Sequence, residues 1–419
     1  MKTKLPLLIV SLLLLITASC SSDDKPGDLA LFAVPVVKSL QSIRDGVTVT
    51  AARATASEGK IYVTEDYLFY TAKEEGVHIF DNTNPAAPQN IAFIAVEGVH
   101  DIAVKGNYLF ADNFVDLLVF DISNINNITL VNTIESQIEF YPTIPEGVEY
   151  VDYTNNAGTD EVIVGYTTKM KPRPTYSMED IFTVDDNMGG NAGGGAAEAA
   201  TGIGGSYAKF QINQNALYTI DSYELNVFNI SSPEQAYFDK SVYMMQWFGG
   251  GVFETLFRQG GYLFVGSTTG MYVVDANDAF NPVFISGFSH ATACDPVVVS
   301  GNTAYITVRG GSTCGAIEDE VTVIDITDIN NPTLLSSYLI DQPRGLGIRN
   351  NVLYVCTGAG LKVFDASNTA ALVLQHSYSD NVTDVIPLPG QLITVGPNNI
   401  KQYRYGPGNT LEYLSVVNF

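Results

Sequence analysis

One short pattern recurs along this chain and limits the folds that it can adopt. The segment LLVFDIS at 117–123 is an apolar run that ends in an aspartate and leads into a turn-forming stretch. A degenerate copy, IKQYRYG, occupies 400–406. The recognisable copies are VHIFDNT (77–83), LLVFDIS (117–123), LNVFNIS (225–231), MYVVDAN (271–277), VTVIDIT (321–327) and LKVFDAS (361–367). A period of about 40 to 50 residues is typical of a propeller or a solenoid.

Each copy lies in a similar context of short apolar segments. Around the second copy the chain reads VHDIAVKGN, YLFADNF, DLLVFDIS and ITLVNTIES, which predicts four strands joined by turns. The chain contains 23 Tyr, 21 Phe and 37 Gly, which favours strands and turns over helices. We therefore predict an all-β fold, a single β-propeller of four-stranded blades. Counting the degenerate copy gives seven blades, and six or eight are the alternatives.

The acid that ends each copy has a predicted structural role. Its side chain can accept a hydrogen bond from the backbone N–H two residues further on and so cap the turn. Asparagine can make the same bond, which explains the copy that lacks an acid. The residues at this position are Asp81, Asp121, Asn229, Asp275, Asp325 and Asp365.

These copies resemble LVIVD repeats. The segments YLFVGSTTGMYVVDA, CDPVVVSGNTAYITVR and VEYVDYTNNAGTDEVIVGYTT are together similar to a family of Bacteroidetes surface lipoproteins that carry such repeats. The resemblance covers 57–419 and implies a β-propeller on an exported lipoprotein. It implies no activity and no catalytic residues.

The N-terminus predicts export. MKTK is followed by an apolar run of 12 residues, LPLLIVSLLLLI, which is too short to span a bilayer and is typical of a signal peptide, at 1–19. The small residues before Cys20 resemble the lipobox at which lipid is attached to a cysteine, although Thr17 departs from the usual Leu. Residues 20–56 are predicted to be a tether and lead-in, and SSDDKPGD resembles a surface-export signal. We expect an outer-membrane lipoprotein exposed at the cell surface, with its lipid as a membrane anchor.

The period breaks between the second and third copies. Asp121 and Asn229 are 108 residues apart, more than two periods. We predict an insertion at 137–205 that contains a hairpin and a flexible glycine-rich loop. If the hairpin were instead a decayed blade, the propeller would have eight blades.

The cysteines divide into three kinds. Cys20 is the predicted lipid site, and Cys356 lies in an apolar strand, where we expect a buried free thiol. Cys294 and Cys314 flank two strands of one predicted blade, so we predict a disulfide between them in an exported protein. No Cys or His spacing suggests zinc.

Four acids are predicted to meet at the propeller axis. The first strands of the blades line the channel, and aligning their entry ends places Asp101, Glu254, Asp295 and Asp384 together. The equivalent position in another blade is Gly345, beside Arg344.

Two histidines, His100 and His290, lie in the same connecting loops and complete a candidate ligand site. One hypothesis is that Asp101, Asp295 and Asp384 bind Ca²⁺ or another divalent cation. The alternative is that these carboxylates accept hydrogen bonds from strand-end N–H groups or water, and no cofactor is otherwise indicated.

Charge restricts the partners. The net charge is −24, from 45 acidic and 21 basic residues, and no basic stripe is present, which excludes nucleic acid as a partner. We favour a monomeric, non-enzymatic binding module for a protein or glycan. The alternatives are an extracellular hydrolase or lyase acting at the axial mouth, and a scaffold of an outer-membrane complex.

Overall fold

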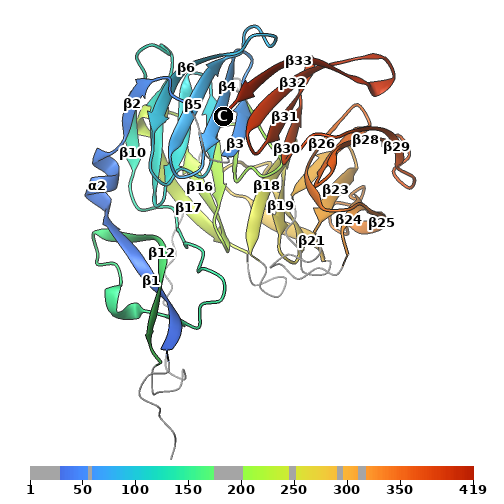
Figure 1. Ribbon diagram of the computed structural model, residues 1–419. Helices are drawn as coiled ribbons and strands as arrows, with labels where there is room; N and C mark the ends of the chain where they lie inside the picture. Colours follow the sequence, from blue (N-terminus) through green and yellow to red (C-terminus); the bar gives the residue numbers. More distant parts are fainter. Residues whose placement is uncertain (1–28, 55–58, 174–201, 245–251, 290–295, 310–317) are drawn as a thin grey trace, which may run out of the picture. The chain divides into compact units, whose positions relative to one another are not determined.

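The chain divides into two compact units, which we describe separately. The computed structural model describes residues 29–54, 59–173, 202–244, 252–289, 296–309 and 318–419 (Figure 1). One unit comprises 1–39 and 141–185, and the other comprises 40–140 and 186–419. The signal peptide, Cys20, Cys294, Cys314, Asp295, His290 and most of the glycine-rich segment lie outside the described residues. No helix in the described part of the chain is long and apolar enough to cross a membrane.

The larger unit is built from antiparallel sheets of four successive strands, numbered here as blades 1 to 7. Blades 1 to 4 consist of β3 (Gly59–Val63), β4 (Tyr67–Ala72), β5 (Gly76–Asp81) and β6 (Gln89–Ala95); β7 (Ile102–Lys105), β8 (Tyr108–Asn113), β9 (Asp116–Asp121) and β10 (Thr129–Ile134); β14 (Phe210–Asn213), β15 (Ala216–Ile220), β16 (Glu224–Asn229) and β17 (Tyr237–Tyr243); and β18 (Phe253–Gln259), β19 (Tyr262–Ser267), β20 (Gly270–Asp275) and β21 (Val283–Ser289).

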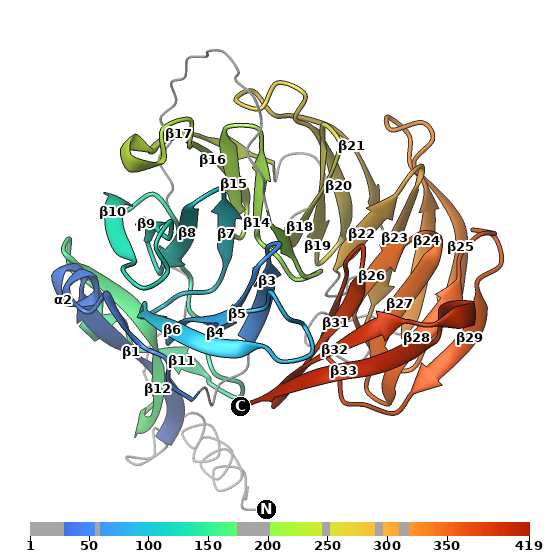
Figure 2. The same cartoon turned by 90° about the horizontal axis from the view of Figure 1, so that it is seen from above.

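Blades 5 to 7 follow the same order. They consist of β22 (Val297–Ser300), β23 (Thr303–Val308), β24 (Glu320–Asp325) and β25 (Thr333–Leu339); β26 (Pro343–Arg349), β27 (Val352–Thr357), β28 (Gly360–Asp365) and β29 (Val373–Tyr378); and β30 (Asp384–Pro387), β31 (Gln391–Gly396), β32 (Asn399–Tyr405) and β33 (Leu411–Asn418). Figure 2 shows the sheets of this unit around a central axis, with first strands such as β7, β14 and β18 innermost. The described residues thus confirm the all-β propeller, with seven four-stranded blades.

Short elements extend this pattern. Blade 1 gains β13 (Ile203–Gly204) on its inner edge and β2 (Thr48–Ala51) on its outer edge. Two 3₁₀ turns, η2 (Pro233–Gln235) and η3 (Pro407–Asn409), precede the fourth strands of blades 3 and 7.

The predicted turn caps are confirmed at all six positions. In each copy, the side-chain Oδ1 of the terminal Asp or Asn accepts a hydrogen bond of 2.8–3.0 Å from the backbone N–H two residues further on. Hydrogen bonds from the hydroxyl and amide of Thr83 lower the pKa of Asp81, and Ser123 acts in the same way on Asp121. These acids therefore belong to the scaffold.

The ring is closed by side chains where the first blade meets the last. The ring centroid of Tyr70 in blade 1 lies 4.3 Å from the ring centroid of Phe419, which follows β33. The amides of Asn82 and Gln402, 3% and 1% exposed, bond each other in both directions, at 3.2 and 2.7 Å. Because each buried amide satisfies the other, the pair stabilises the closure between two blades that share no strand among the described residues.

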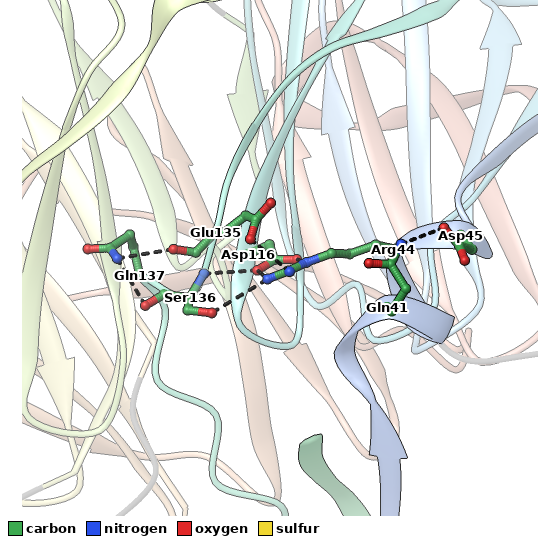
Figure 3. A network of polar contacts seen from close by, with 7 residues as sticks. All are labelled: Gln41, Arg44, Asp45, Asp116, Glu135, Ser136 and Gln137. Atoms are coloured by element: carbon green, nitrogen blue, oxygen red, sulfur yellow. Dashed lines mark hydrogen bonds and ion pairs between the residues drawn. The ribbon is translucent and has the colours of Figure 1, made fainter. Parts of the chain in front are cut away.

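A short helix, α2 (Leu40–Asp45), is attached to blade 2 by one arginine (Figure 3). Arg44 bonds both carboxylate oxygens of Asp116 at 2.8 Å and also contacts Glu135 at 2.8 Å. The Ser136 N–H adds a bond of 2.9 Å to the same carboxylate. The Asp116 side chain is only 1% exposed, so Arg44 supplies most of its charge compensation.

The smaller unit corrects the predicted hairpin, and it also shows that part of the predicted tether and lead-in forms a strand. Its sheet has the order β11 (Tyr150–Val151), β1 (Leu29–Ser39) and β12 (Glu161–Pro172), with η1 (Tyr153–Asn155) in the connection. The predicted hairpin is therefore wrong in its pairing, because β1 lies between its two arms. β1 comes from the predicted lead-in, whose apolar sequence LALFAVPVVKS pairs along β12 from Leu29 to Ser39.

Candidate functional site

A cavity opens at the entry ends of the first strands of the larger unit. Its volume is about 350 Å³, and we call it the mouth cavity. Blades 1, 2 and 7 contribute its walls, together with a segment that precedes blade 3. Its lining residues include Lys60, Lys73, His100, Tyr207, Lys209 and Asp384.

The segment at 202–209, here the inner segment, is bonded to several blades. The N–H groups of Gly202 and Gly205 donate to Val104 O and Ile61 O, both at 3.3 Å. Further along, Leu256 of blade 4 donates its N–H to Ala208 O at 2.7 Å. The inner segment therefore lies among the first strands. Its residues 202–205 belong to the insertion predicted at 137–205, but they are bonded to the blades.

Asp384 holds the middle of the inner segment. Its Oδ1 accepts the Ser206 N–H at 3.2 Å, the Ser206 hydroxyl at 2.7 Å and the Val385 N–H at 2.9 Å. Burial raises the pKa of Asp384 to about 6, against the opposing effect of the hydrogen bonds from Ser206. The carboxyl group therefore changes its protonation state close to neutral pH.

Asp101 holds the end of the same segment. Its Oδ1 accepts the Ile102 N–H at 2.8 Å, and its Oδ2 accepts the Lys209 N–H. Oδ2 also lies 3.4 Å from Lys60 Nζ. Both axial acids that the structure describes at equivalent positions thus bond strand-end N–H groups, as the alternative to cation binding predicted.

The strand register shows which residues are truly equivalent at the axis. In each blade a two-residue turn joins the first two strands, and the residue just before this turn pairs with the residue just after it. The equivalent axial residue lies four positions before the residue that precedes the turn. These residues are Lys60, Asp101, Lys209, Thr255, Pro296, Gly345 and Asp384. Glu254 is displaced by one residue because β18 has a bulge between Phe253 and Thr255. The ring is therefore mixed in charge, with two lysines that the sequence alignment missed.

The glycine in this ring has a steric reason. A Cβ atom on Gly345 would collide with Oδ1 of Asp384 in the next blade. Neighbouring Arg344 donates from NH1 to the Asn381 side chain at 3.1 Å and is not among the lining residues of the mouth cavity. Glycine thus makes room for the carboxylate of the adjacent blade.

His100 pairs with Asp112 and not with Asp101, its neighbour in the sequence. Its Nδ1 lies 3.2 Å from Asp112 Oδ2, and its backbone N–H donates to Asp112 Oδ1 at 2.7 Å. The ring packs against Phe140, with centroids 5.2 Å apart. With Nδ1 occupied, Nε2 is the ring nitrogen left to meet a ligand.

The cation hypothesis stays a prediction. Asp101 and Asp384 carry the hydrogen bonds described above, and Asp295 and His290 lie outside the described residues. Among the described residues, no cluster of three or more His, Cys, Asp or Glu side chains is arranged to hold a metal ion. Cys356 is a buried free thiol, as predicted, and burial raises its pKa.

The sequence contains a signal for the two lysines, because the strand alignment, if extended to blades 1 and 3, places Lys60 and Lys209 at the axis. KIYVT in blade 1 and KFQIN in blade 3 begin at the same strand position as DIAVK in blade 2. The inner segment had no comparable signal, because it is part of no repeat.

Comparisons with known proteins agree with this architecture. The LVIVD repeat model matches residues 98–135, 292–340 and 344–380. No curated protein sequence matches the chain.

Several solved structures are similar in fold. A protein from Lactobacillus plantarum has a TM-score of 0.53 at 12% identity, with 93% of this chain and 96% of that chain covered. The periplasmic gluconolactonase of Pseudomonas aeruginosa has a TM-score of 0.52 at 9% identity, with coverages of 89% and 96%. A candidate 6-phosphogluconolactonase from Bacteroides uniformis has a TM-score of 0.50 at 10% identity, with coverages of 86% and 97%. At these identities the likeness is one of fold alone, and the chain is a β-propeller with LVIVD repeats in three stretches.

Proposed function

We propose that this protein is an exported lipoprotein whose propeller binds a small anionic ligand in the mouth cavity. One observation carries the proposal: Lys60, Lys73 and Lys209 line a cavity of about 350 Å³ in a chain with a net charge of −24. A basic cavity on an acidic protein concentrates an anion at one place and repels it elsewhere. The sequence alone favoured an acidic mouth, whereas Lys60 and Lys209 give the axial ring a mixed charge and, with Lys73, give the cavity lining more lysines than carboxylates.

The dimensions suit a compact ligand. Ligand pockets measure about 300 to 1,000 Å³, so this cavity is at the small end of the range. A sugar acid or another hydroxylated carboxylate would place its charge near the lysines and its hydroxyl groups near Thr71 and Thr383, which also line the cavity.

Gluconate is a suitable first probe of this site. Isothermal titration should show binding to the wild type, and either Lys60→Gln or Lys209→Gln should weaken it about tenfold, because each removes one charge facing the anion. Lys362→Gln on β28, outside the lining, is the matched control and should bind as the wild type does. Raising the salt concentration should weaken binding. Equal affinity in all four proteins would reject the proposal, and enhancement by Ca²⁺ that Asp384→Asn abolishes would favour the cation hypothesis.

Lactone hydrolysis is the second candidate function. A carboxyl group with a pKa of about 6 in this cavity is suited to general-base work near neutral pH, and two proteins of similar fold are named for lactones. The same titration with glucono-1,5-lactone separates the two candidates. Turnover that Asp384→Asn abolishes would favour an enzyme, whereas gluconate binding without turnover favours a binding module.

The lipoprotein part of the proposal depends on Cys20. Cells grown with labelled palmitate should incorporate label into the wild-type protein and none into Cys20→Ala. Cys356→Ala, which removes a buried thiol, is the matched cysteine control and should keep the label. Persistent labelling of Cys20→Ala would reject lipid attachment at this residue.

A further inference from the structure

The amine of Lys209 differs from the other two cavity lysines in its surroundings. Lys60 contacts Asp101 at 3.4 Å, and Lys73 is exposed. Lys209 follows the inner segment directly, and its backbone N–H is bonded to Asp101. Among the described residues, no hydrogen bond or ion pair reaches its Nζ atom.

Electrostatics keeps this amine available for reaction. Burial lowers the pKa of Lys209, and the nearby charge of Lys60 lowers it further, against the opposite effect of Asp112, Asp101 and Glu254. A lysine that is desolvated beside another cation is more often neutral at a given pH than an exposed lysine, and only the neutral amine is a nucleophile. The same cavity contains the side chains of His100 and Asp384, two groups of the kinds that can donate a proton to a leaving oxygen.

We propose that Lys209 forms a reversible imine with a small carbonyl-bearing acid, such as an oxo acid, bound in the mouth cavity. This rests on the proposed function, because the same lysines would recognise the acid group. Lys60 and Lys73 would pair with the carboxylate and leave the carbonyl carbon facing Lys209.

The chemistry needs nothing beyond the ligand and the side chains. The neutral Nζ attacks the carbonyl carbon to form a C–N bond, and the carbonyl oxygen takes up a proton. Loss of that oxygen as water, with a proton donated by His100 or Asp384, leaves a C=N bond. The amine gives up two protons in all, the oxygen leaves as water, and no electrons are gained or lost.

Reductive trapping tests this directly. The full mature chain is incubated with glyoxylate and cyanoborohydride at pH 7, and the modified lysines are located by peptide mass mapping. Cyanoborohydride delivers hydride to the imine carbon and makes the link permanent. We expect labelling at Lys209 to be at least about tenfold faster than at the exposed lysines, because binding and desolvation both favour it.

Two variants separate chemistry from folding. Lys209→Arg keeps the charge and the backbone contacts of the inner segment but cannot form an imine, so it should lose the fast label while its unfolding midpoint matches that of the wild type. Lys362→Arg is the matched control and should keep the fast label on Lys209. Labelling of Lys209 no faster than that of exposed lysines overturns the proposal.

Gluconate distinguishes this failure from failure of the proposed function. Gluconate binding without fast labelling rejects the imine alone. Fast labelling of Lys209 without gluconate binding rejects the anion-binding function and leaves the reactive amine standing.

Discussion

Replacing Arg44 by Met is expected to lower the free energy of unfolding by about 3 kcal/mol, as is typical when one partner of a buried ion pair is removed. The Asp116 carboxylate is 1% exposed and would keep the Ser136 N–H as its bonding partner in place of two guanidinium bonds. Chemical denaturation at pH 7 measures the loss.

Two further variants identify the cause. Adding Asp116→Leu to Arg44→Met should recover most of the stability, because it removes the uncompensated charge. Arg404→Met is the exposed control: Arg404 pairs with Glu412 at 2.7 Å, but both side chains are about half exposed, so its loss should cost less than about 1 kcal/mol. If Arg44→Met costs no more than Arg404→Met, the network of Figure 3 does not stabilise the fold.

Acid is expected to destabilise the propeller through His78. This residue of β5 is 0% exposed, and its ring centroid lies 4.6 Å from that of Phe93. Within the described part of the chain, neither ring nitrogen has a hydrogen-bond partner. Burial lowers its pKa from 6.5 to about 4, and the charge of Arg53 acts in the same direction while Glu75 opposes it.

The sign of the effect follows from proton uptake. Between pH 6.5 and about 4 the unfolded chain binds a proton at His78 that the folded chain does not, so stability is lost as the pH falls through this window. A gap of about 2.5 between the two pKa values corresponds to a loss of about 3 kcal/mol.

The measurement is the difference in unfolding free energy between wild type and His78→Leu from pH 7.5 to 4. The variant should lack the loss assigned to His78, and His78→Phe, which keeps an aromatic ring, should behave in the same way. Asp384 has the opposite dependence, since its raised pKa lets the folded chain take up a proton first, but it is present in all three proteins and cancels. Parallel curves for the three proteins would contradict the assignment.

The blades and their turns could be predicted because both depend on nearby residues. A third strand such as Gly360–Asp365 is apolar on both faces and ends in an acid two residues before its bonding partner, so pattern and hydrogen bond lie within one short segment. The same reasoning failed for the hairpin at 150–172, because its two arms are joined by β1, more than 100 residues away in sequence. Pairing between distant segments leaves no periodic trace in the chain.

The candidate site shows the same division more sharply. By itself the sequence determined that first strands converge on an axis and that Asp101 and Asp384 occupy equivalent places there. Only the tertiary structure decided the charge of the axial ring. A bulge displaces Glu254, two lysines complete the ring, and backbone N–H groups of the inner segment donate hydrogen bonds to the carboxylates. A repeat specifies local strand geometry, whereas a one-residue shift in register or a segment crossing from elsewhere is settled by packing among blades.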